Sequence, residues 1–306
     1  MQRGKPEWLK VKMPGGERYN AIKGRSRELK LHTVCEEAQC PNIGECWNSG
    51  TATFMVMGDT CTRGCRFCAV STARNPPPPD VDEPKNVAEA IAEMQLDYVV
   101  VTSVNRDDLP DQGAGHFAAC IRAIRARNPH TLVETLIPDF CGRLDLLDLV
   151  LDARPDVLAH NVETVPRLQS PVRDPRATWA QSMSVLAHAH GRPGQMTKTS
   201  IQVGHGETEE ELLDAMRLLR GIDVDFLTLG QYLRPSMNHM AVKEFVTPEA
   251  FARLGQAGEA MGFRYVASGP LVRSSYRAGE FFINEFLRKR SAQEAGTEHP
   301  SADHLG

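Results

Sequence analysis

The most informative stretch of the sequence is Thr53-Phe-Met-Val-Met-Gly-Asp-Thr-Cys-Thr-Arg-Gly-Cys-Arg-Phe-Cys68. Its first five residues predict a short buried β-strand, and the cysteines that follow have the spacing C-x3-C-x2-C. Three thiolates from one tight loop suit an iron–sulfur cube, because ligation by three cysteines keeps one iron free to bind a substrate or cofactor. Gly64 permits the loop to wrap closely, and Arg63 and Arg66 are expected to offset the negative charge of thiolates and sulfides.

A second cysteine triad lies immediately upstream. Cys35, Cys40 and Cys46 have the spacing C-x4-C-x5-C, so six of the eight cysteines of the chain fall in two groups of three. Disulfides are one alternative, but a chain of this size without a secretory signal has no need of them. Structural zinc is another, although it favours closed sets of four ligands, and only the downstream triad contains a C-x2-C pair. Two cubane sites, each without a fourth cysteine, are the better interpretation.

Composition excludes several classes of protein. The chain has 306 residues, of which 41% are hydrophobic and 24% charged, which is ordinary for a globular protein with a full core. The net charge of −4 argues against a duplex-DNA binder, and no apolar run approaches the roughly 18 residues that a membrane span requires. Residues 1–12 lack the pattern of a signal or transit peptide. We therefore expect a cytoplasmic protein, or a mitochondrial matrix protein if this is a processed organellar form, that binds neither nucleic acid nor membrane.

The remainder of the chain alternates between strand-like and helix-like segments. Apolar, β-rich runs cover residues 53–57, 98–102, 131–137, 157–160, 198–203, 226–229 and 264–267. Amphipathic helices are expected at residues 86–95, 115–127, 144–152, 178–190, 207–220 and 248–261. Six such alternations predict a parallel sheet, because parallel neighbours need crossover connections. An open Rossmann-like sheet and a partial barrel give the same pattern, and in both of them ligands bind at the carboxyl ends of the strands.

Several further motifs accompany the two triads. They are Gly50-Thr-Ala-Thr-Phe-Met, Thr102-Ser-Val-Asn-Arg-Asp-Asp-Leu-Pro110, Leu136-Ile-Pro-Asp-Phe140, His160-Asn-Val-Glu-Thr-Val-Pro166, Val246-Thr-Pro-Glu and Arg273-Ser274-Ser275-Tyr276. Together with the triads, they resemble the lipoyl synthase family of the radical S-adenosylmethionine (SAM) superfamily over residues 28–287. The resemblance implies an α/β fold: a partial (β/α)6 TIM-type barrel of the radical SAM class, with N-terminal and C-terminal extensions that carry an auxiliary cluster.

The resemblance also implies how the chain is divided. Residues 1–52 are expected to form an N-terminal extension with the ligands of the auxiliary iron–sulfur cluster, and residues 53–268 the radical SAM partial barrel. Residues 269–290 form a C-terminal segment with the Arg-Ser-Ser-Tyr motif. Residues 291–306 are polar and small, and we expect a disordered tail there.

The activity implied by the resemblance is that of a sulfurtransferase. Lipoyl synthases insert two sulfur atoms at C6 and C8 of a protein-bound N6-octanoyl-lysine to give lipoyl-lysine, and the sulfur comes from the auxiliary 4Fe–4S cluster. Two 4Fe–4S clusters and SAM are therefore the expected cofactors. Cys61, Cys65 and Cys68 hold the cluster that binds SAM, and Cys35, Cys40, Cys46 and Ser275 ligate the auxiliary cluster. An alkoxide is a harder ligand than a thiolate and suits iron less well, so Ser275 is expected to leave first.

Five residues are candidates for contacts with SAM. Phe67 lies within the cysteine loop, and Asn161 and Glu163 share one face of a strand end, although such residues also commonly cap their own loops. Gly204 and Gly206 could let the backbone approach the adenosyl group. The segment lacks the third glycine of a dinucleotide site. It departs from the family at His205, where an apolar residue is usual.

The resemblance names partners as well. They are octanoylated lipoyl-carrier domains (2-oxoacid dehydrogenase E2 or glycine cleavage H protein), an electron donor such as ferredoxin or flavodoxin, and an iron–sulfur carrier for cluster repair. The basic residues Lys23, Arg25, Arg27 and Lys30 could recognise an acidic carrier or form a solvated surface.

Two other functions remain open at this point. One is a radical SAM enzyme that inserts sulfur into a free small molecule, and the other, from a different class, is a two-cluster electron-transfer protein. Cys120 and Cys141 stand alone in the sequence and are interpreted as buried small hydrophobes or incidental thiols.

Overall fold

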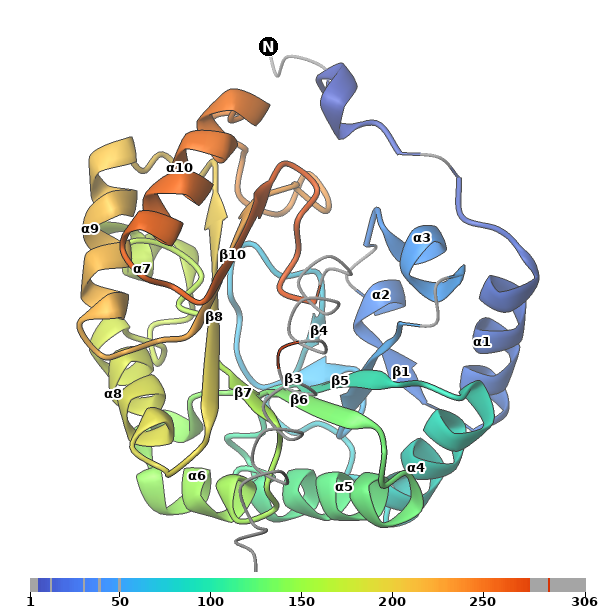
Figure 1. Ribbon diagram of the computed structural model, residues 1–306. Helices are drawn as coiled ribbons and strands as arrows, with labels where there is room; N and C mark the ends of the chain where they lie inside the picture. The colour runs from blue at the N-terminus through green and yellow to red at the C-terminus, as the bar shows by residue number, and fades with distance from the viewer. Residues whose placement is uncertain are drawn as a thin grey trace, which may run out of the picture.

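In this computed structural model, residues 5–11, 13–29, 31–37, 40–48, 51–275 and 286 are described. An eight-stranded sheet forms the centre of the fold, in the order β1-β2-β5-β6-β7-β8-β9-β10. Its strands are β1 (His32–Thr33), β2 (Thr53–Val56), β5 (Tyr98–Ser103), β6 (Leu132–Leu136), β7 (Val157–Ala159), β8 (Met196–Val203), β9 (Phe226–Gln231) and β10 (Tyr265–Gly269). All neighbours are parallel except β1, which pairs antiparallel with β2. The sheet curves around the centre of the molecule as an open barrel (Figure 1).

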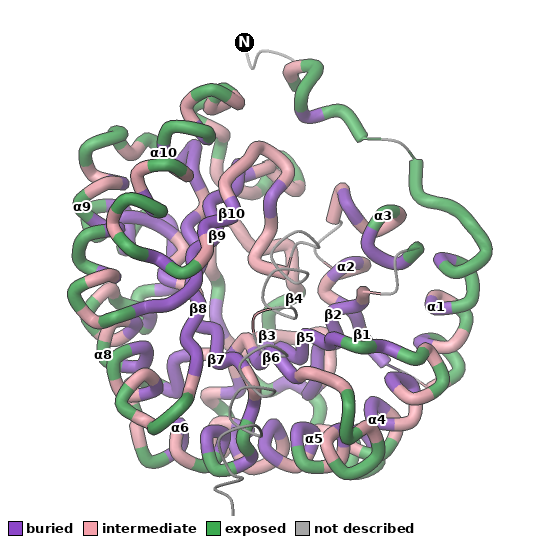
Figure 2. The backbone as a smooth tube through the Cα atoms, in the orientation of Figure 1, coloured by how far each residue is buried: buried purple, intermediate pink, exposed green. Residues whose placement is uncertain are grey.

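Six helices supply the crossover connections and lie outside the curved sheet (Figure 1). They are α4 (Glu83–Met94), α5 (Ala114–Arg127), α6 (Leu144–Leu151), α8 (Trp179–His190), α9 (Glu209–Arg220) and α10 (Pro248–Ala260). Thr178, Thr208 and Thr247 cap the last three, each accepting a hydrogen bond from a backbone N–H of the first turn. Their inner faces are buried and their outer faces exposed (Figure 2). The expected parallel sheet is thereby confirmed as a partial barrel rather than an open Rossmann-like sheet.

The amino-terminal end of the barrel interior is filled by side chains. Tyr98, Val100, Val157, Met196 and Phe226 form an apolar cluster there. Beside this cluster, the Lys198 ammonium contacts both oxygens of the Glu134 carboxylate at 2.7–2.8 Å, and the Tyr98 hydroxyl donates to Glu134 at 2.6 Å. Lys198 and Glu134 are both almost fully buried, so each depends on the other to offset the cost of burial. This packing leaves the carboxyl ends of the strands as the place for a ligand.

The N-terminal extension adds its own small helices to one edge of the sheet. They are the 3-10 turn η1 (Glu7–Leu9), α1 (Glu17–Glu28), α2 (Val34–Glu37) and α3 (Ile43–Asn48). Trp47 is fully buried and packs on Tyr19, with ring centroids 5.1 Å apart. The antiparallel strand β1 joins the extension to the barrel, so the boundary expected near residue 52 falls inside a continuous sheet. The expected segment limits stay predictions.

Short elements account for the main differences from the expected pattern. Two strands of two residues each, β3 (Thr60–Cys61) and β4 (Ser71–Thr72), pair on either side of the cysteine loop, and neither was expected. The first crossover helix of the barrel, α4, begins at Glu83 and not at residue 86 as predicted, because Pro84 is well tolerated in the first turn of a helix. Within the described residues, no helix is long and apolar enough to cross a membrane. The predicted tail at 291–306 lies outside the described residues.

Candidate active site

Both cysteine triads line one cavity of about 480 Å³ at the carboxyl ends of the strands. Ser103 of β5, Leu136 of β6 and Gln231 of β9, each at or near the end of its strand, belong to its wall. The predicted cluster ligands that line it are Cys35, Cys40, Cys46, Cys61, Cys65, Cys68 and Ser275. Residues far apart in the sequence thus converge on one space, at the edge of the sheet where the β/α pattern places ligands.

The second triad lies on a loop that is fixed by backbone hydrogen bonds. The β3–β4 pair closes the base of the loop, where Ala73 N–H donates to the Cys61 carbonyl at 3.0 Å. The sulfur atoms also accept backbone hydrogen bonds: Cys61 Sγ from Arg63 and Asn105 (3.4 and 3.3 Å), and Cys65 Sγ from Asp174 (3.3 Å). N–H groups directed at sulfur stabilise thiolates and cluster sulfur, so the loop is prepared for metal ligation.

Burial disfavours the thiolate form of two cysteines of this triad. It raises the pKa of Cys65 to about 11 and that of Cys68 to about 12. In the first triad, burial likewise raises the pKa of Cys40. A thiol that binds a metal loses its proton outright. Two sets of three thiols, partly or fully buried around one cavity, therefore fit iron–sulfur clusters better than they fit free cysteines.

Arg63 was expected to offset thiolate charge, but its guanidinium pairs with two carboxylates and also donates to Cys141 Sγ at 3.1 Å. It donates to Asp107 through Nε and one terminal nitrogen (2.9 and 2.8 Å) and to Asp139 through the other (2.8 Å). Arg63 is buried, and these bonds tie the cysteine loop to the segments that follow β5 and β6. On the other flank, Gly64 N–H donates to Asp174, whose carboxylate also pairs with Arg176. Arg63 thus positions the loop.

The first triad is built on two short helices of the extension. Cys35 lies in α2, Cys46 in α3, and Cys40 between them, with Cys40 N–H donating to the Cys35 carbonyl at 3.0 Å. Asn42 Nδ2 donates to the carbonyl oxygen of Leu271 at 2.6 Å. This bond brings the segment that contains Ser275 next to the triad. Tyr276, the last residue of the motif, lies outside the described residues.

Arg273 supplies positive charge beside the first triad. Arg273 lines the same cavity. Burial raises the pKa of Cys40, and the positive charge of Arg273 partly offsets this rise. Burial in turn lowers the pKa of Arg273 itself, against the favourable field of Cys40. One guanidinium nitrogen of Arg273 donates to the Val272 carbonyl at 2.6 Å, which fixes the side chain.

The candidate SAM contacts fall into two groups. Phe67, Asn161 and Glu163 line the cavity. Burial raises the pKa of Glu163, whose Oε2 accepts a hydrogen bond from Gln202 at 2.7 Å. Gly204 and Gly206 are not among the described residues that line the cavity. Their part in SAM binding stays a prediction.

The two glycines have a local structural role. Gly204 has φ +104°, and a Cβ there would lie 2.2 Å from the amide nitrogen of Gln231 and 2.6 Å from the Glu244 carbonyl oxygen. The Glu207 carboxylate accepts the N–H groups of both Gly204 and His205. This turn therefore needs glycine for its own packing, independently of any ligand.

His205 lies behind the cavity wall. Its ring stacks on Tyr232 at 4.4 Å between centroids and meets the edge of Phe67 at 6.4 Å. Both Phe67 and Tyr232 line the cavity. Burial lowers the pKa of His205 to about 4, so the ring is neutral at physiological pH and packs as an aromatic side chain. His205 therefore packs behind the cavity wall in the manner of the apolar residue that is usual at this position.

Sequence reasoning missed several polar residues of the cavity. His160, Arg173, Gln202, Gln231, Tyr232 and Arg234 also line it. Gln202 and Gln231 could have been found, because they share a strand face with other wall residues or end a strand. Arg173 could not, because it follows the short helix α7 (Gln169–Val172) in a segment without periodicity.

The basic group of the extension is partly committed to internal contacts. Arg25 pairs with Glu93 of α4 and with Glu28, and the Lys23 ammonium lies 5.7 Å from the centre of the Tyr19 ring. Lys30 lies outside the described residues. The expected docking surface is therefore less basic than the sequence indicates.

Comparison with known proteins agrees with this architecture. A model of the Radical SAM superfamily matches residues 55–219. Methylornithine synthase superposes with a TM-score of 0.53 over 90% of this chain and 94% of its own, at 12% identity. Streptococcus suis SuiB, bound to precursor peptide SuiA, gives 0.55 over 82% and 52%, at 8% identity. At such identities the structures show the fold alone. Fold and cysteine loop together define a member of the radical SAM superfamily, which implies a 4Fe–4S cluster and SAM.

More similar sequences narrow the class. A model described as the N-terminal domain of lipoyl synthase of the Radical SAM family matches residues 2–40. "Lipoyl synthase, chloroplastic" of Arabidopsis thaliana is 60% identical over 291 residues, covering 93% of this chain and 74% of its own. "Lipoyl synthase, mitochondrial" of Ostreococcus lucimarinus is 59% identical over 296 residues, covering 95% and 74%. The chain belongs to the lipoyl synthase family, and the resemblance noted from its motifs is confirmed.

The compartments in the names of these relatives are organellar. They give no support to the expected cytoplasmic location and agree with the alternative of a processed organellar form. These compartments are known from the names of the relatives and are not assigned to this chain.

Proposed function

We propose that this protein inserts two sulfur atoms, at C6 and C8, into a protein-bound N6-octanoyl-lysine, with the auxiliary 4Fe–4S cluster as the sulfur-donating substrate. The observation that carries the proposal is the convergence of both cysteine triads and Ser275 on one cavity. A radical enzyme that used only SAM would need the second triad alone. A sulfur source and a site of radical formation that share one cavity would lie within reach of the same substrate, which supports the proposal.

Cys61, Cys65 and Cys68 would hold the cluster that binds SAM. A cluster with one free iron supplies the electron that cleaves SAM to a radical able to abstract hydrogen from an unactivated carbon. The chain contributes orientation: the N–H groups of Asn105 and Asp174 fix two of the sulfur atoms, and Arg63 ties the loop to the barrel.

The cavity also offers apolar surface for an octanoyl chain. Met55, Leu136 and Ile137 belong to its lining, and Met55 projects inward from β2. Phe54, the alternate residue of the same strand, is fully buried in the core that includes helices α4 and α5. Met55 belongs to the same core, but it is the residue of the pair that also lines the cavity, so it is the candidate for substrate contact.

Cys35, Cys40, Cys46 and Ser275 would hold the auxiliary cluster. Ser275 would be the ligand displaced most readily, because its oxygen is harder than sulfur, and the positive charge of Arg273 would balance the thiolates nearby. The substrate is an octanoylated carrier domain, of either a 2-oxoacid dehydrogenase E2 or the glycine cleavage H protein. A ferredoxin or flavodoxin supplies electrons, and an iron–sulfur carrier rebuilds the consumed cluster.

The deciding experiment compares two triple variants under anaerobic conditions. Wild type, Cys35→Ala/Cys40→Ala/Cys46→Ala and Cys61→Ala/Cys65→Ala/Cys68→Ala are reconstituted with iron and sulfide, then assayed with SAM, reductant and an octanoylated carrier domain. We expect about eight irons in wild type and about four in each variant. The first variant should cleave SAM without forming lipoyl-lysine, and the second should do neither.

The same assay separates the alternatives. Lipoyl-lysine formed at the wild-type rate by the first variant would remove the auxiliary cluster as sulfur source. SAM cleavage without any product on the carrier domain would favour sulfur insertion into a free small molecule. Two redox-active clusters without SAM cleavage would indicate an electron-transfer protein. Arg127→Ala is the control, because it changes an exposed side chain that pairs with Glu89 outside both triads.

A further inference from the structure

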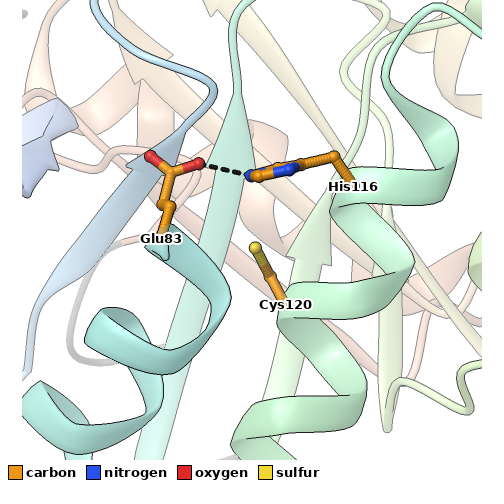
Figure 3. Close-up of side chains that lie close together, drawn as sticks. All are labelled: Glu83, His116 and Cys120. Carbon is orange, nitrogen blue, oxygen red and sulfur yellow. Dashed lines mark hydrogen bonds and ion pairs between the residues drawn. The ribbon is translucent and has the colours of Figure 1, made fainter. Parts of the chain in front are cut away.

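A third group of metal-binding side chains lies between helices α4 and α5. Glu83 is the first residue of α4, and His116 and Cys120 are on α5 (Figure 3). One carboxylate oxygen, one ring nitrogen and the sulfur of these residues all lie within 4.8 Å of one another. Cys120 is fully buried, and the side chains of Glu83 and His116 are 7% and 17% exposed. The group belongs to the helical layer, and none of its members lines the cavity of the cysteine triads.

Helix geometry explains why the three residues meet. His116 and Cys120 are four residues apart, so they lie on the same face of α5, the face toward α4. Glu83 Oε2 lies 2.6 Å from His116 Nε2 and accepts the backbone N–H of Met57 at 2.8 Å. The sequence analysis interpreted Cys120 as a buried small hydrophobe or an incidental thiol and missed this His-x3-Cys spacing.

The chemistry of the three donors favours a particular kind of cation. Without a metal, burial and then the charge of Glu83 raise the pKa of the Cys120 thiol. Thiolate, imidazole and carboxylate together suit zinc, whereas magnesium and calcium prefer oxygen ligands alone. The donor atoms of tetrahedral zinc lie about 3.3–3.6 Å apart, as follows from Zn–N/O and Zn–S bonds of about 2.0–2.3 Å. Side-chain adjustments of about 1 Å would therefore form the site.

We propose that Glu83, His116 and Cys120 bind a zinc ion, with water as the fourth ligand. The ion takes the place of the Glu83–His116 hydrogen bond, and the Cys120 thiol releases its proton to solvent as the zinc–sulfur bond forms. Partial exposure of His116 provides access for the ion and the water. This proposal is independent of the sulfur-insertion chemistry.

The proposed ion connects to the active site through the backbone. Met57 ends the segment that includes β2, has φ 67°, and leads through three residues into Cys61. Its N–H is held by Glu83, and its Sδ fills the space beside Gly113, where a Cβ would lie 2.2 Å from that sulfur. A ligand of the ion thus holds the backbone that presents the radical SAM cysteines.

The test measures zinc directly on protein with both iron–sulfur clusters loaded, so that the cluster cysteines are occupied. Wild type, Cys120→Ala and His116→Gln are titrated with zinc against a competing chelator, and bound zinc is counted by mass spectrometry. We expect one zinc per wild-type chain, with affinity lowered at least tenfold in both variants. Zinc K-edge absorption of wild type should show one sulfur at about 2.3 Å and nitrogen or oxygen at about 2.0–2.1 Å. Cys141→Ala should bind zinc as wild type does.

Three results would overturn the proposal. The first is that wild type binds no zinc at micromolar free metal, and the second is that both variants bind zinc with the wild-type affinity. The third is a zinc absorption spectrum with three or more sulfur ligands, which would place the ion on the cluster cysteines. If Cys120→Ala fails to fold, His116→Gln decides alone, because its side chain is partly exposed. Zinc should then raise the Tm of wild type and leave that of His116→Gln unchanged, and an equal rise in both would count against the site.

Discussion

The side chain of Asn42 donates a hydrogen bond to the carbonyl oxygen of Leu271, 229 residues away, at 2.6 Å. Asn42 is buried and lies in the sequence between Cys40 and Cys46, and Leu271 lies two residues before Arg273, the start of the Arg-Ser-Ser motif. A single amide therefore holds together the two parts of the chain that would ligate the auxiliary cluster.

Replacement of Asn42 by alanine should weaken the auxiliary site selectively. The partly buried Leu271 carbonyl would lose its partner, which costs about 0.5–1.5 kcal/mol for a typical hydrogen bond. We expect a lower Tm and iron content that falls from about eight toward four after reconstitution, with SAM cleavage retained. Asn128→Ala is the control. It removes a similar bond from a side-chain amide to a backbone carbonyl, that of Ala88, between the end of α5 and α4 and outside the cavity. An equal loss of iron in both variants would contradict the assignment.

Ser275→Cys should separate SAM cleavage from sulfur insertion. Cysteine holds iron more firmly than serine, so the auxiliary cluster would open less readily. We expect SAM cleavage near the wild-type rate and lipoyl-lysine formation lowered about tenfold or more. The measurement is 5′-deoxyadenosine and lipoyl-lysine from the same reaction. Normal product formation by Ser275→Cys, or an equal loss in Ser274→Ala, would remove the special role of Ser275.

The ion pair at the base of the barrel should be sensitive to the loss of one partner. Lys198→Met leaves the Glu134 carboxylate buried and unpaired, which should lower the free energy of unfolding by about 3–5 kcal/mol. Lys198→Met/Glu134→Gln should recover part of the loss, because no charge then remains and Gln still accepts from Tyr98. Chemical denaturation measures both. Arg127→Ala, which breaks an exposed pair with Glu89, should cost no more than about 1 kcal/mol.

His205 should make the protein less stable in mild acid. Its pKa is about 4 in the folded protein, against about 6.5 when unfolded, so the unfolded state binds more protons in between. Stability contributed by neutral His205 is therefore present above pH 6.5 and lost as pH falls toward 4. His205→Leu removes this dependence, and its Tm should fall less steeply between pH 6.5 and 4.5. His160, whose pKa burial also lowers to about 4, is present in both proteins and gives the shared background.

Much of the barrel could be predicted from sequence, because long parallel strands and amphipathic helices carry local periodicity. Strand β8 illustrates the limit, because it begins at Met196 and not at residue 198 as predicted. Met196 and Lys198 share the inner face of this strand, so an apolar and a charged residue are buried side by side and the pattern is obscured. The strands β3 and β4 have two residues each, too few for any pattern. Their pairing depends on the loop between them.

The candidate site also combines features that have a local sequence pattern with features that have none. Cysteine spacing alone indicated two clusters, since metal ligation requires nearby donors. The meeting of Asn42 with Leu271 is a tertiary contact without a local signal, and only the family resemblance drew attention to Ser275. The glycines at 204 and 206 show that one pattern can have two causes, because their positive φ serves the turn itself, while their predicted contact with SAM stays a prediction.

The position of Ser275 has a consequence for biosynthesis. A ribosome produces Cys35, Cys40 and Cys46 early, and the antiparallel pairing of β1 with β2 joins neighbouring stretches of chain that can fold as they emerge. Ser275 follows Cys46 by about 230 residues, after every strand of the barrel has been made. The three cysteines are therefore made long before Ser275, and an auxiliary cluster with all four proposed ligands would be completed only after the barrel strands have been translated.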